Sequence, residues 1–474
     1  MTEAEAEARA VYRQGEDAVV AVLVNFGRRL QELEVKLGMN STNSSKPPST
    51  DNKLTKNKSK TTSTSKNKRG AQVGHKGSNL KISATPDITN ILLPFECSCC
   101  HASLKDARSS KIEKRQVFDL PDIKIQITEY QAHTKECPKC NALNKPLFPN
   151  TLNATVQYGD NLKSFISYCN TYQMLPYERI AEMIEDLTSH KMGKGTIYNF
   201  LSTHHEKLEI FENEIKPILL KEDVLHSDET GINVNAKLNW IHVSSSKNAT
   251  FYMLHEKRGQ EAFKAMDILP HYKGVLVHDH WRAYNNYECK HSFCNAHILR
   301  ELSGITQLSG VIWSKDMHTL LTNMNITVHK AKNSEKTVLS EPQVDKFTKH
   351  YEKIIHSALR YYPPPETAIE KTRGRPKQDK GKNLLDRLTT YQEEHLRFLN
   401  DFRVPFTNNL AERDLRMVKV KEKISGTFVS FKGGEMFCRI RSYISTLKKN
   451  NIAVLQGLRD ALEGRAYVPL GVGC

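Results

Sequence analysis

The segment from residue 223 to residue 302 limits the possible folds more than any other part of the chain. It begins with three strand-like runs joined by short polar turns, VLHSDETGINV, WIHVSSS and TFYMLHE. The helix-like run RGQEAFKAMDIL follows, and then GVLVHDHW, a short apolar run typical of a buried strand. SFCNAHILREL has the pattern of a further strand that leads into a helix. We therefore expect a three-stranded meander, a helix, a buried strand and one more strand.

Two aspartates lie on strands of this segment. The order of elements resembles that of ribonuclease-H-like folds, in which the first and fourth strands are neighbours in the sheet. Asp228 lies on the first strand and Asp279 ends the fourth, so the two carboxylates should converge. Successive side chains of a strand point to opposite faces. Glu229 should therefore point away from Asp228, and its replacement by glutamine should have a mild effect.

Converging carboxylates indicate a metal site. They raise each other's pKa unless a cation lies between them, and oxygen ligands in an open site suit Mg²⁺ or Mn²⁺. Phosphoryl transfer uses two such ions about 3.5–4 Å apart, one at the attacking hydroxyl and one at the leaving oxygen. A third carboxylate normally completes the site. Glu412 is the candidate, early in a helix that the preceding TNN could cap.

Four of the ten cysteines form two CxxC pairs, CSCC (97–100) and CPKC (137–140). Between them, KRQVFDLPDIKIQITEYQAHT alternates like paired strands. Two such pairs around a hairpin indicate a zinc ribbon with one closed structural Zn²⁺ site, whose ligands would be Cys97, Cys100, Cys137 and Cys140. A metal-free cysteine cluster is the alternative, and Cys99 and His101 leave the ligands of the first pair open.

The charge of the chain indicates a polyanionic partner. There are 69 Lys and Arg residues against 53 Asp and Glu residues, a net charge of +16. Residues 41–84 hold ten of the basic residues and one aspartate, with almost no large apolar side chain. Such a segment cannot bury a core and should be disordered when free. We expect a basic arm that lies along DNA phosphates; a plain flexible linker is the alternative.

Two helical patterns suggest further roles. LPYERIAEMIEDLTSH and KMGKGTIYNFLSTHHEKL are separated by a glycine-containing turn, as in a helix-turn-helix whose second helix enters the major groove. Lys194 and Thr196 at its start are then candidate DNA contacts, although any helical hairpin has this pattern. Residues 16–38 repeat apolar side chains in steps of four and three. That spacing is typical of a coiled coil and predicts a homodimer; helix packing onto a domain is the alternative.

Several motifs together resemble the insertion-sequence-sixty-six transposases, bacterial members of the DDE transposase class. They include NSSKPPSTD (43–51), GAQVGHKG (70–77), LPYERI (175–180), HSDETG (226–231) and NNLAERDLR (408–416). The resemblance implies that Asp228, Asp279 and Glu412 are the catalytic triad and that residues 301–400 are a helical insertion. It also implies accessory proteins of the same element. The family usually has glycine after the first CxxC, where this chain has His101.

Side chains around the expected triad suggest further contacts. Asn409, Arg413 and Arg416 lie at helical spacing from Glu412 and could hold DNA phosphates; a solvated helix face is the alternative. Cys294 and His297 form a CxxH pair near the site, for which core packing is the preferred interpretation over metal binding. RGRPK (373–377) resembles a minor-groove hook, or is a charged loop of the insertion.

The expected fold is a multidomain α+β protein with a short N-terminal coiled coil, a zinc ribbon, a helix-turn-helix-like region and a ribonuclease-H-like catalytic domain with a helical insertion. The boundaries we expect are 1–40, 41–84, 85–150, 151–218, 219–300, 301–400 and 401–465. The expected function is that of a DNA transposase acting on double-stranded DNA; an inactive zinc-ribbon DNA-binding protein or a ribonuclease-H-like nuclease is the alternative. The longest apolar run, AVVAVLVNF, is far shorter than the roughly 18 residues of a membrane span, and no signal peptide is evident, so we expect a cytoplasmic protein.

Overall fold

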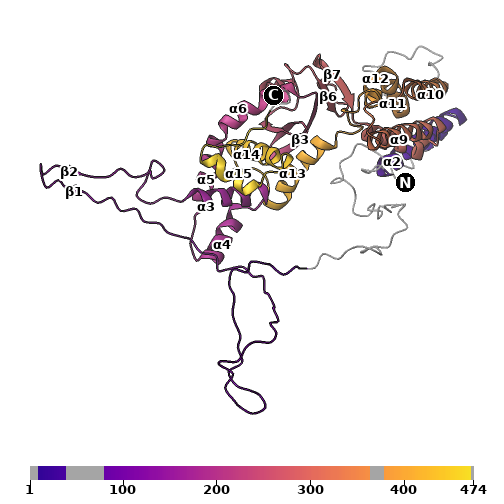
Figure 1. Cartoon of the computed structure of the whole chain (residues 1–474). Helices are drawn as coiled ribbons and strands as arrows, with labels where there is room; N and C mark the ends of the chain where they lie inside the picture. The colour runs from indigo at the N-terminus through magenta and orange to yellow at the C-terminus, as the bar shows by residue number, and fades with distance from the viewer. Residues whose placement is uncertain (1–8, 39–79, 363–377, 471–474) are drawn as a thin grey trace.

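The computed structural model describes residues 9–38, 80–362 and 378–470. The chain is a mixed α/β protein, about half helical, with one five-stranded sheet. Figure 1 shows a body of sheet and helices, a group of helices beside it, and two long loops that extend from it. Within the described ranges, no helix is both long and apolar enough to cross a membrane.

The five-stranded sheet has the order β5-β4-β3-β6-β7. The first three strands form the predicted antiparallel meander, while β6 pairs in parallel with β3 and β7 pairs in parallel with β6. The chain passes from β5 through α7 (Gln260–Met266) to β6, which lies on the opposite side of β3 from β4. The parallel pairing of β6 with β3 requires a long connection of this kind. The strands are β3 (Val224–Val234), β4 (Lys237–Ser245), β5 (Thr250–His255), β6 (Val275–His278) and β7 (Lys290–Phe293).

A two-residue turn fixes the register of the β3–β4 hairpin. Asn235 and Ala236 both have positive φ values, 47° and 60°, as in the type I′ turn that matches the twist of a hairpin. The pairing then runs from Val234 opposite Lys237 to His226 opposite Ser245. This register settles which β3 side chains share a face.

Helices cover both faces of the sheet. The even-numbered β3 side chains Ile232 and Val234 pack with Leu415 and Val418 of α13 (Asn409–Ser425) in one core. Leu225, an odd-numbered residue, belongs to the larger core on the opposite face. The period of two along a strand therefore places Asp228 on the face that α13 covers and Glu229 on the other.

The larger core packs the sheet against helices that precede it in the chain and against helices near the C-terminus. It includes α3 (Asp160–Ser167), α4 (Tyr177–Thr188), α5 (Lys194–Lys207), α6 (Glu209–Lys221), α14 (Phe431–Lys449) and α15 (Val454–Leu462). Buried His204 of α5 illustrates the packing, because its ring contacts the Ser167 hydroxyl at 2.8 Å and the Leu458 carbonyl at 2.9 Å. The two helices of the predicted helix-turn-helix, α4 and α5, are thus part of the packed body.

The described residues of the interval 301–400 are mostly helical and have their own core; that they form an insertion in a catalytic domain stays a prediction. Trp313, Leu321, Tyr351 and Leu385 are buried in this core, and the Tyr351 hydroxyl donates to the Leu388 carbonyl at 2.8 Å. The RGRPK stretch lies outside the described residues. The helices are α8 (Asn295–Ser309), α9 (Ile312–Asn333), α10 (Glu341–Leu359), α11 (Lys380–Thr390) and α12 (Gln392–Asn400).

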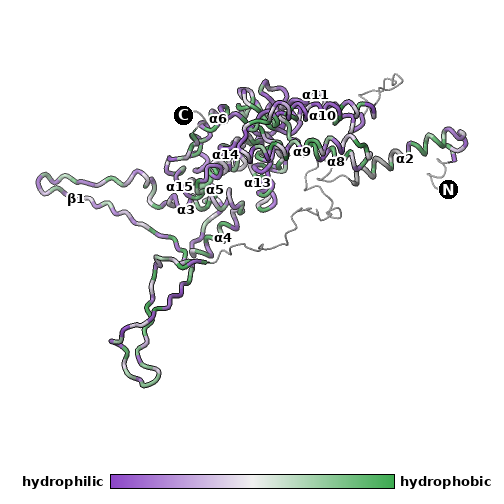
Figure 2. The backbone as a smooth tube through the Cα atoms, turned by 45° about the vertical axis from the view of Figure 1, so that its right-hand side comes forward, coloured by the Kyte–Doolittle hydropathy of each residue, from purple (hydrophilic) through white to green (hydrophobic). Residues whose placement is uncertain are grey.

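The paired strands expected between the two CxxC pairs are absent from the structure, and that prediction is wrong. Residues 109–134 have no regular secondary structure, and the only strands nearby are the two-residue β1 (Lys135–Glu136) and β2 (Leu143–Asn144). Val117, Leu120 and Ile127 are exposed. Figure 2 shows hydrophobic positions along these extended loops, away from the body. Alternation produces a stable hairpin only when its apolar face is buried against something, and here it is not.

The N-terminal repeat forms a helix, α2 (Glu16–Gly38). Leu23, Phe26, Leu30 and Leu33 are exposed, Leu30 by 48% and Leu33 by 54%. These exposed apolar side chains stabilise an isolated helix only when another helix or domain covers them. The coiled coil and the homodimer stay predictions, and so does the packing of this helix on another domain.

Replacing both Leu30 and Leu33 with aspartate tests the coiled coil. Two charges in the seam should prevent pairing, so that sedimentation gives the mass of a monomer where the unmodified chain gives that of a dimer. Val24 is 67% exposed and lies beside the seam, so Val24→Asp is the matched control and should leave the mass unchanged. If the double variant sediments like the unmodified chain, this helix does not hold two copies together.

Candidate active site

Asp228 and Asp279 occupy equivalent positions on neighbouring parallel strands. In the β3–β6 ladder, Val224 pairs with Val275 and His226 pairs with Val277. Asp228 lies on β3 two residues after His226, and Asp279 lies just past the end of β6, two residues after Val277. The ladder thus brings the two positions to the same end of neighbouring strands, and the charge of Asp279 acts on Asp228. A shared metal site for the two carboxylates stays a prediction.

The third predicted carboxylate comes from the helix that covers this face. Glu412 lies in the first turn of α13, and its charge, with those of Glu229 and Asp279, acts on Asp228. Burial is the main cause that raises the pKa of Asp228 well above its usual value, followed by the charges of Glu229, Asp279 and Glu412. Such a cluster favours a bound cation, because a cation offsets both the repulsion and the loss of water.

Asn408 fastens the start of α13 to β3. This residue is 1% exposed, and its side-chain oxygen accepts from His226 Nδ1 at 2.9 Å while its amide nitrogen donates to the Ser227 carbonyl at 2.9 Å. Burial lowers the pKa of His226 to about 4, so the ring is neutral at pH 7. The helix that carries Glu412 is therefore joined to the strand immediately before Asp228.

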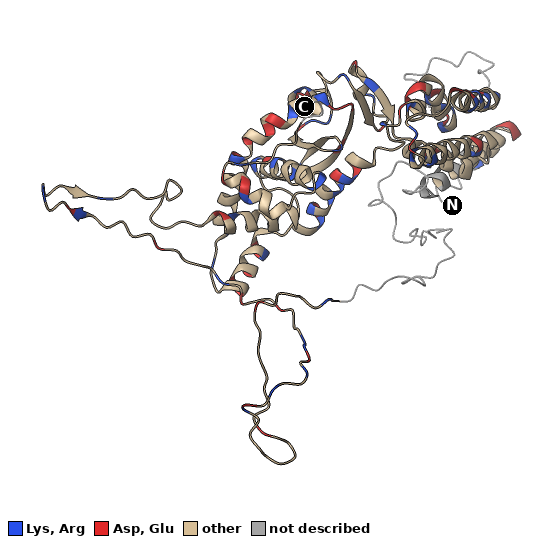
Figure 3. Cartoon of the chain, in the orientation of Figure 1, with Lys and Arg blue, Asp and Glu red and all other residues tan. Residues whose placement is uncertain are grey.

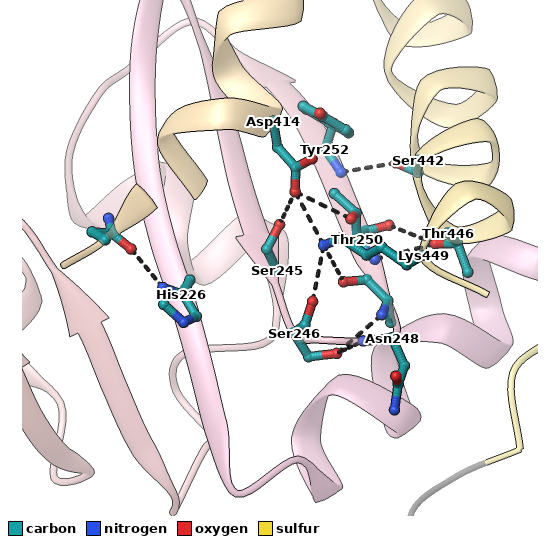
Figure 4. A network of polar contacts seen from close by, with 12 residues as sticks. His226, Ser245, Ser246, Asn248, Thr250, Tyr252, Asp414, Ser442, Thr446 and Lys449 are labelled. Atoms are coloured by element: carbon teal, nitrogen blue, oxygen red, sulfur yellow. Dashed lines mark hydrogen bonds and ion pairs between the residues drawn. The ribbon is translucent and has the colours of Figure 1, made fainter. Parts of the chain in front are cut away.

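A buried ion pair holds the second turn of α13. Asp414 Oδ2 lies 3.1 Å from Lys449 Nζ and accepts from the Ser245 hydroxyl at 2.5 Å and the Thr250 hydroxyl at 3.3 Å. Lys449 also donates to the carbonyls of Ser246 and Ala249. Figure 4 shows these groups between α13, the β4–β5 turn and the end of α14. Because Asp414 follows Glu412 by two residues, this network also sets the orientation of Glu412.

Replacing Asp414 with asparagine should lower the free energy of unfolding by about 3–5 kcal/mol, the usual cost of leaving a buried charge without its partner. The Asp414 and Lys449 side chains are only 14% and 11% exposed, so solvent cannot replace the lost charge. Urea unfolding followed by circular dichroism measures the change.

The control is Glu422→Gln on the same helix. Glu422 forms a more exposed ion pair with Lys419, and its loss should cost less than about 1 kcal/mol. Equal effects of the two substitutions would show that Asp414 does not hold the helix.

Glu229 has a larger role than the sequence predicts. Its carboxylate is fully buried and accepts from Arg258 at 2.8 Å and from the Tyr284 hydroxyl at 2.5 Å. The Arg258 guanidinium lies between the rings of Trp240 and Trp281, 4.9 Å and 4.2 Å from their centroids. Burial, with the charge of Asp279, raises the pKa of Glu229 to about 7 against the effects of Tyr284 and Arg258.

These contacts connect β3 to the loop that carries Asp279. The Trp281 amide donates to Asp279 Oδ1 at 3.1 Å, so the ring stacked on Arg258 belongs to the residue that orients this aspartate. Glu229 points to the opposite face of the sheet from Asp228. From that face its contact with Arg258 helps to position the loop that carries Asp279. We therefore no longer expect the replacement of Glu229 by glutamine to be mild, because the substitution leaves Arg258 without its anionic partner.

Cys294 and His297 lie beside Glu412. The Cys294 thiol donates to Glu412 Oε1 at 3.7 Å, and one ligand atom from each of the three residues lies within 4.8 Å of the others. The Cys294 sulfur also accepts from the Asn408 amide at 3.2 Å, and His297 Nδ1 is buried with no hydrogen-bond partner. The sequence placed this CxxH pair near the site but gave no reason to connect it with Glu412.

The predicted DNA contacts lie on two helices. Asn409, Arg413 and Arg416 are exposed on α13, as expected of side chains free to meet a ligand or simply solvent. Lys194 is the first residue of α5 and pairs with Glu178 at 2.7 Å. It lines a cavity of about 490 Å³ between α5 and the α13–α14 connection. DNA binding by these residues and by Thr196 stays a prediction.

The two CxxC pairs have the same backbone geometry. The Cys97 amide donates to the Ala102 carbonyl and the Cys137 amide to the Ala142 carbonyl, both at 2.9 Å. The residue after each pair, His101 or Asn141, has a positive φ of 56° or 54°. Glycine adopts that conformation most readily, and here two residues with side chains occupy it.

Backbone amides also favour the thiolate form in both pairs. The amides of Cys100 and Cys99 lower the pKa of Cys97, and those of Lys139 and Cys140 lower the pKa of Cys137. Each pair thus has the geometry of a zinc knuckle. Among the described residues, however, the four sulfurs are not gathered around one point, so their binding to a single ion stays a prediction.

Replacing Cys100 with serine should release zinc, because three thiolates hold the ion less tightly than four. Elemental analysis of the purified protein should find close to one zinc per unmodified chain and much less in the variant. Cys99 lies in the same turn and is also exposed, so Cys99→Ser is the control and should keep its zinc. If only the Cys99 variant loses its zinc, Cys99 and not Cys100 is the zinc ligand.

Three family models match the chain. The model described as "Transposase IS66 family" matches residues 155–436, which include Asp228, Asp279 and Glu412. The model of the zinc-finger binding domain of transposase IS66 matches residues 94–141, which include the four cysteines of the two CxxC pairs. A family of unknown function matches residues 1–81. No curated protein matches the chain.

Proposed function

The chain belongs to the IS66 family of transposases, and we propose that it cleaves the ends of a mobile DNA element and joins them to target DNA with the help of divalent metal ions. The match to the zinc-finger domain of the same family supports DNA binding and a structural zinc ion. What remains to be argued is how the residues of this chain would perform the reaction.

The observation that carries the proposal is the register of the β3–β6 ladder. It brings Asp228 and Asp279 to equivalent positions, and α13 adds Glu412 from the same face of the sheet. The strand order β5-β4-β3-β6-β7 also agrees with a ribonuclease-H-like catalytic domain. Asp228, Asp279 and Glu412 offer oxygen ligands alone, which suits two Mg²⁺ or Mn²⁺ ions. Among the described residues these oxygens are not already gathered within 4.8 Å of one another, so the ions would have to draw them together.

The carboxylates would hold the ions, and the ions would supply activation of the attacking oxygen and stabilisation of the leaving oxygen. In the first step water attacks the phosphodiester at an element end, the bond to the 3′ oxygen breaks, and a 3′-hydroxyl is released. In the second step this hydroxyl attacks a phosphodiester of the target, and one phosphodiester replaces another. Asp228 is the central ligand in this proposal, since the charges of both Asp279 and Glu412 act on it.

Basic side chains near the site would hold the DNA backbone. Arg413 and Arg416 are exposed on the helix that carries Glu412, and Figure 3 shows several Lys and Arg positions, in blue, along α13. Contacts of this kind position DNA without specifying its sequence. The basic arm at 41–84, most of which lies outside the described residues, would add affinity in the same way.

The proposal predicts that Asp228→Asn, Asp279→Asn and Glu412→Gln each abolish Mg²⁺-dependent cleavage and joining of element-end DNA. The substitutions preserve shape but remove the charge that holds the ions. DNA binding should persist, because it depends on side chains elsewhere. Joining is measured with labelled end DNA and a plasmid target, and binding by a gel-shift titration.

Glu422→Gln, an acid-to-amide change on the same helix as Glu412, is the matched control and should join DNA normally. Nicks without a joined product from the unmodified chain would favour a ribonuclease-H-like nuclease. DNA binding with neither product would favour an inactive DNA-binding protein. If the Glu412 variant joins DNA normally, Glu412 is not the third metal-binding carboxylate.

A further inference from the structure

We propose that Cys294, His297 and Glu412 form a second metal site, selective for zinc-like transition ions, which inhibits DNA joining by withdrawing Glu412 from the other two carboxylates. The inhibitory part rests on the proposed function, because it requires Glu412 to act in joining. The binding part stands on the geometry of the three side chains alone.

The spacing of the three side chains suits a small tetrahedral ion. Cys294 immediately precedes α8, His297 lies in the first turn of that helix, and Glu412 lies in the first turn of α13. The Cys294 sulfur and a Glu412 oxygen are 3.7 Å apart. Bond lengths of about 2.3 Å to sulfur and 2.0 Å to oxygen at a tetrahedral angle separate these two ligands by about 3.5 Å. The side chains therefore need only small movements to close around an ion.

The donor set differs from that of the three carboxylates. A thiolate and an imidazole are poor ligands for Mg²⁺, which prefers oxygen, whereas Zn²⁺ and similar ions bind sulfur, nitrogen and oxygen together. Asp228, Asp279 and Glu412 offer oxygen alone. Glu412 is the one residue common to the two sets, so the two kinds of ion would compete for it.

Two further observations favour a ligand role over simple core packing. His297 Nδ1 is buried and has no hydrogen-bond partner, and such atoms in native proteins usually have one. The Cys294 sulfur already accepts the Asn408 backbone amide at 3.2 Å, a hydrogen bond that a metal-bound thiolate can keep. Burial raises the pKa of the free thiol, so the ion itself has to displace the proton. Binding would replace the thiol proton with the ion and release that proton to solvent.

The position of Glu412 explains how an ion bound at the second site would inhibit DNA joining. Glu412 reaches Cys294 on one side, and its charge acts on Asp228 on the other. A carboxylate held by an ion between Cys294 and His297 is no longer free to complete the Mg²⁺ site. Micromolar zinc should therefore slow joining, and a higher Mg²⁺ concentration should restore it.

Cobalt(II) is the probe for binding, because a thiolate bound to Co²⁺ gives a charge-transfer absorption that does not depend on activity. The full chain is first loaded with one equivalent of zinc, which fills the four-thiolate site expected of the CxxC pairs, and free zinc is then removed so that the second site stays open to cobalt. Added Co²⁺ should then produce the thiolate absorption. Cys294→Ser should abolish this absorption, and His297→Asn should weaken Co²⁺ binding by at least about tenfold.

The matched control is Cys169→Ser. Cys169 is a buried free cysteine whose pKa is raised by burial alone, and its replacement should leave the cobalt absorption intact. If the zinc-loaded chain shows no thiolate absorption, or if the Cys294 variant shows the same absorption, the site does not exist. The first of these results comes from the unmodified protein, so it tests the proposal even if the Cys294 variant does not fold.

Inhibition is tested separately by titrating Zn²⁺ into Mg²⁺-dependent joining. His297→Asn should raise the zinc concentration needed for half inhibition by at least about tenfold, and an unchanged value would show that zinc acts elsewhere. The two proposals fail in different ways. Normal joining by Asp228→Asn would overturn the function while leaving cobalt binding intact, whereas absent cobalt binding beside inactive carboxylate variants would overturn only the second metal site.

Discussion

The parallel pairing of β3 with β6 is the constraint on which the rest of the site depends. A shift of this ladder by one residue would turn Asp228 and Asp279 to different faces of the sheet. The pairs Val224–Val275 and His226–Val277 define this register, and apolar side chains of both strands are buried on the two faces of the sheet. The acidic cluster is thus a consequence of how the sheet is assembled. Repulsion between its charges lowers the stability of the fold, and the packing of the sheet offsets that cost.

The cost of this repulsion explains why α13 is attached so firmly. Asn408 joins its start to β3, and Asp414 joins its second turn to β4, β5 and Lys449 (Figure 4). A buried ion pair adds little net stability, but its groups are satisfied only in one geometry. We interpret the network as a device that fixes the position of Glu412, since an apolar contact would allow the helix to slide.

The candidate metal ligands of the chain are of two chemical kinds. The CxxC pairs lie on extended loops with little packing of their own, so an ion would have to supply much of their folding free energy. The carboxylates, and beside them Cys294 and His297, lie on a framework that packing already holds in place. Zinc in the first region is therefore expected to be structural, while ions in the second would be exchangeable.

Local patterns in the sequence determined the elements of this protein. Strand-like runs between polar turns predicted the meander, a short apolar run predicted the buried strand, and apolar steps of four and three predicted α2. The expected strand order and the resemblance to a transposase family identified Asp228, Asp279 and Glu412 as candidates. The alternating stretch between the CxxC pairs shows the limit of this reasoning, because alternation does not say whether a face will be covered. Tertiary structure alone decided the supports of the site, such as Glu229 with Arg258 and Asn408 with His226. These partners are up to 182 residues apart, and nothing in a local pattern records a contact that exists only after the sheet and α13 have packed.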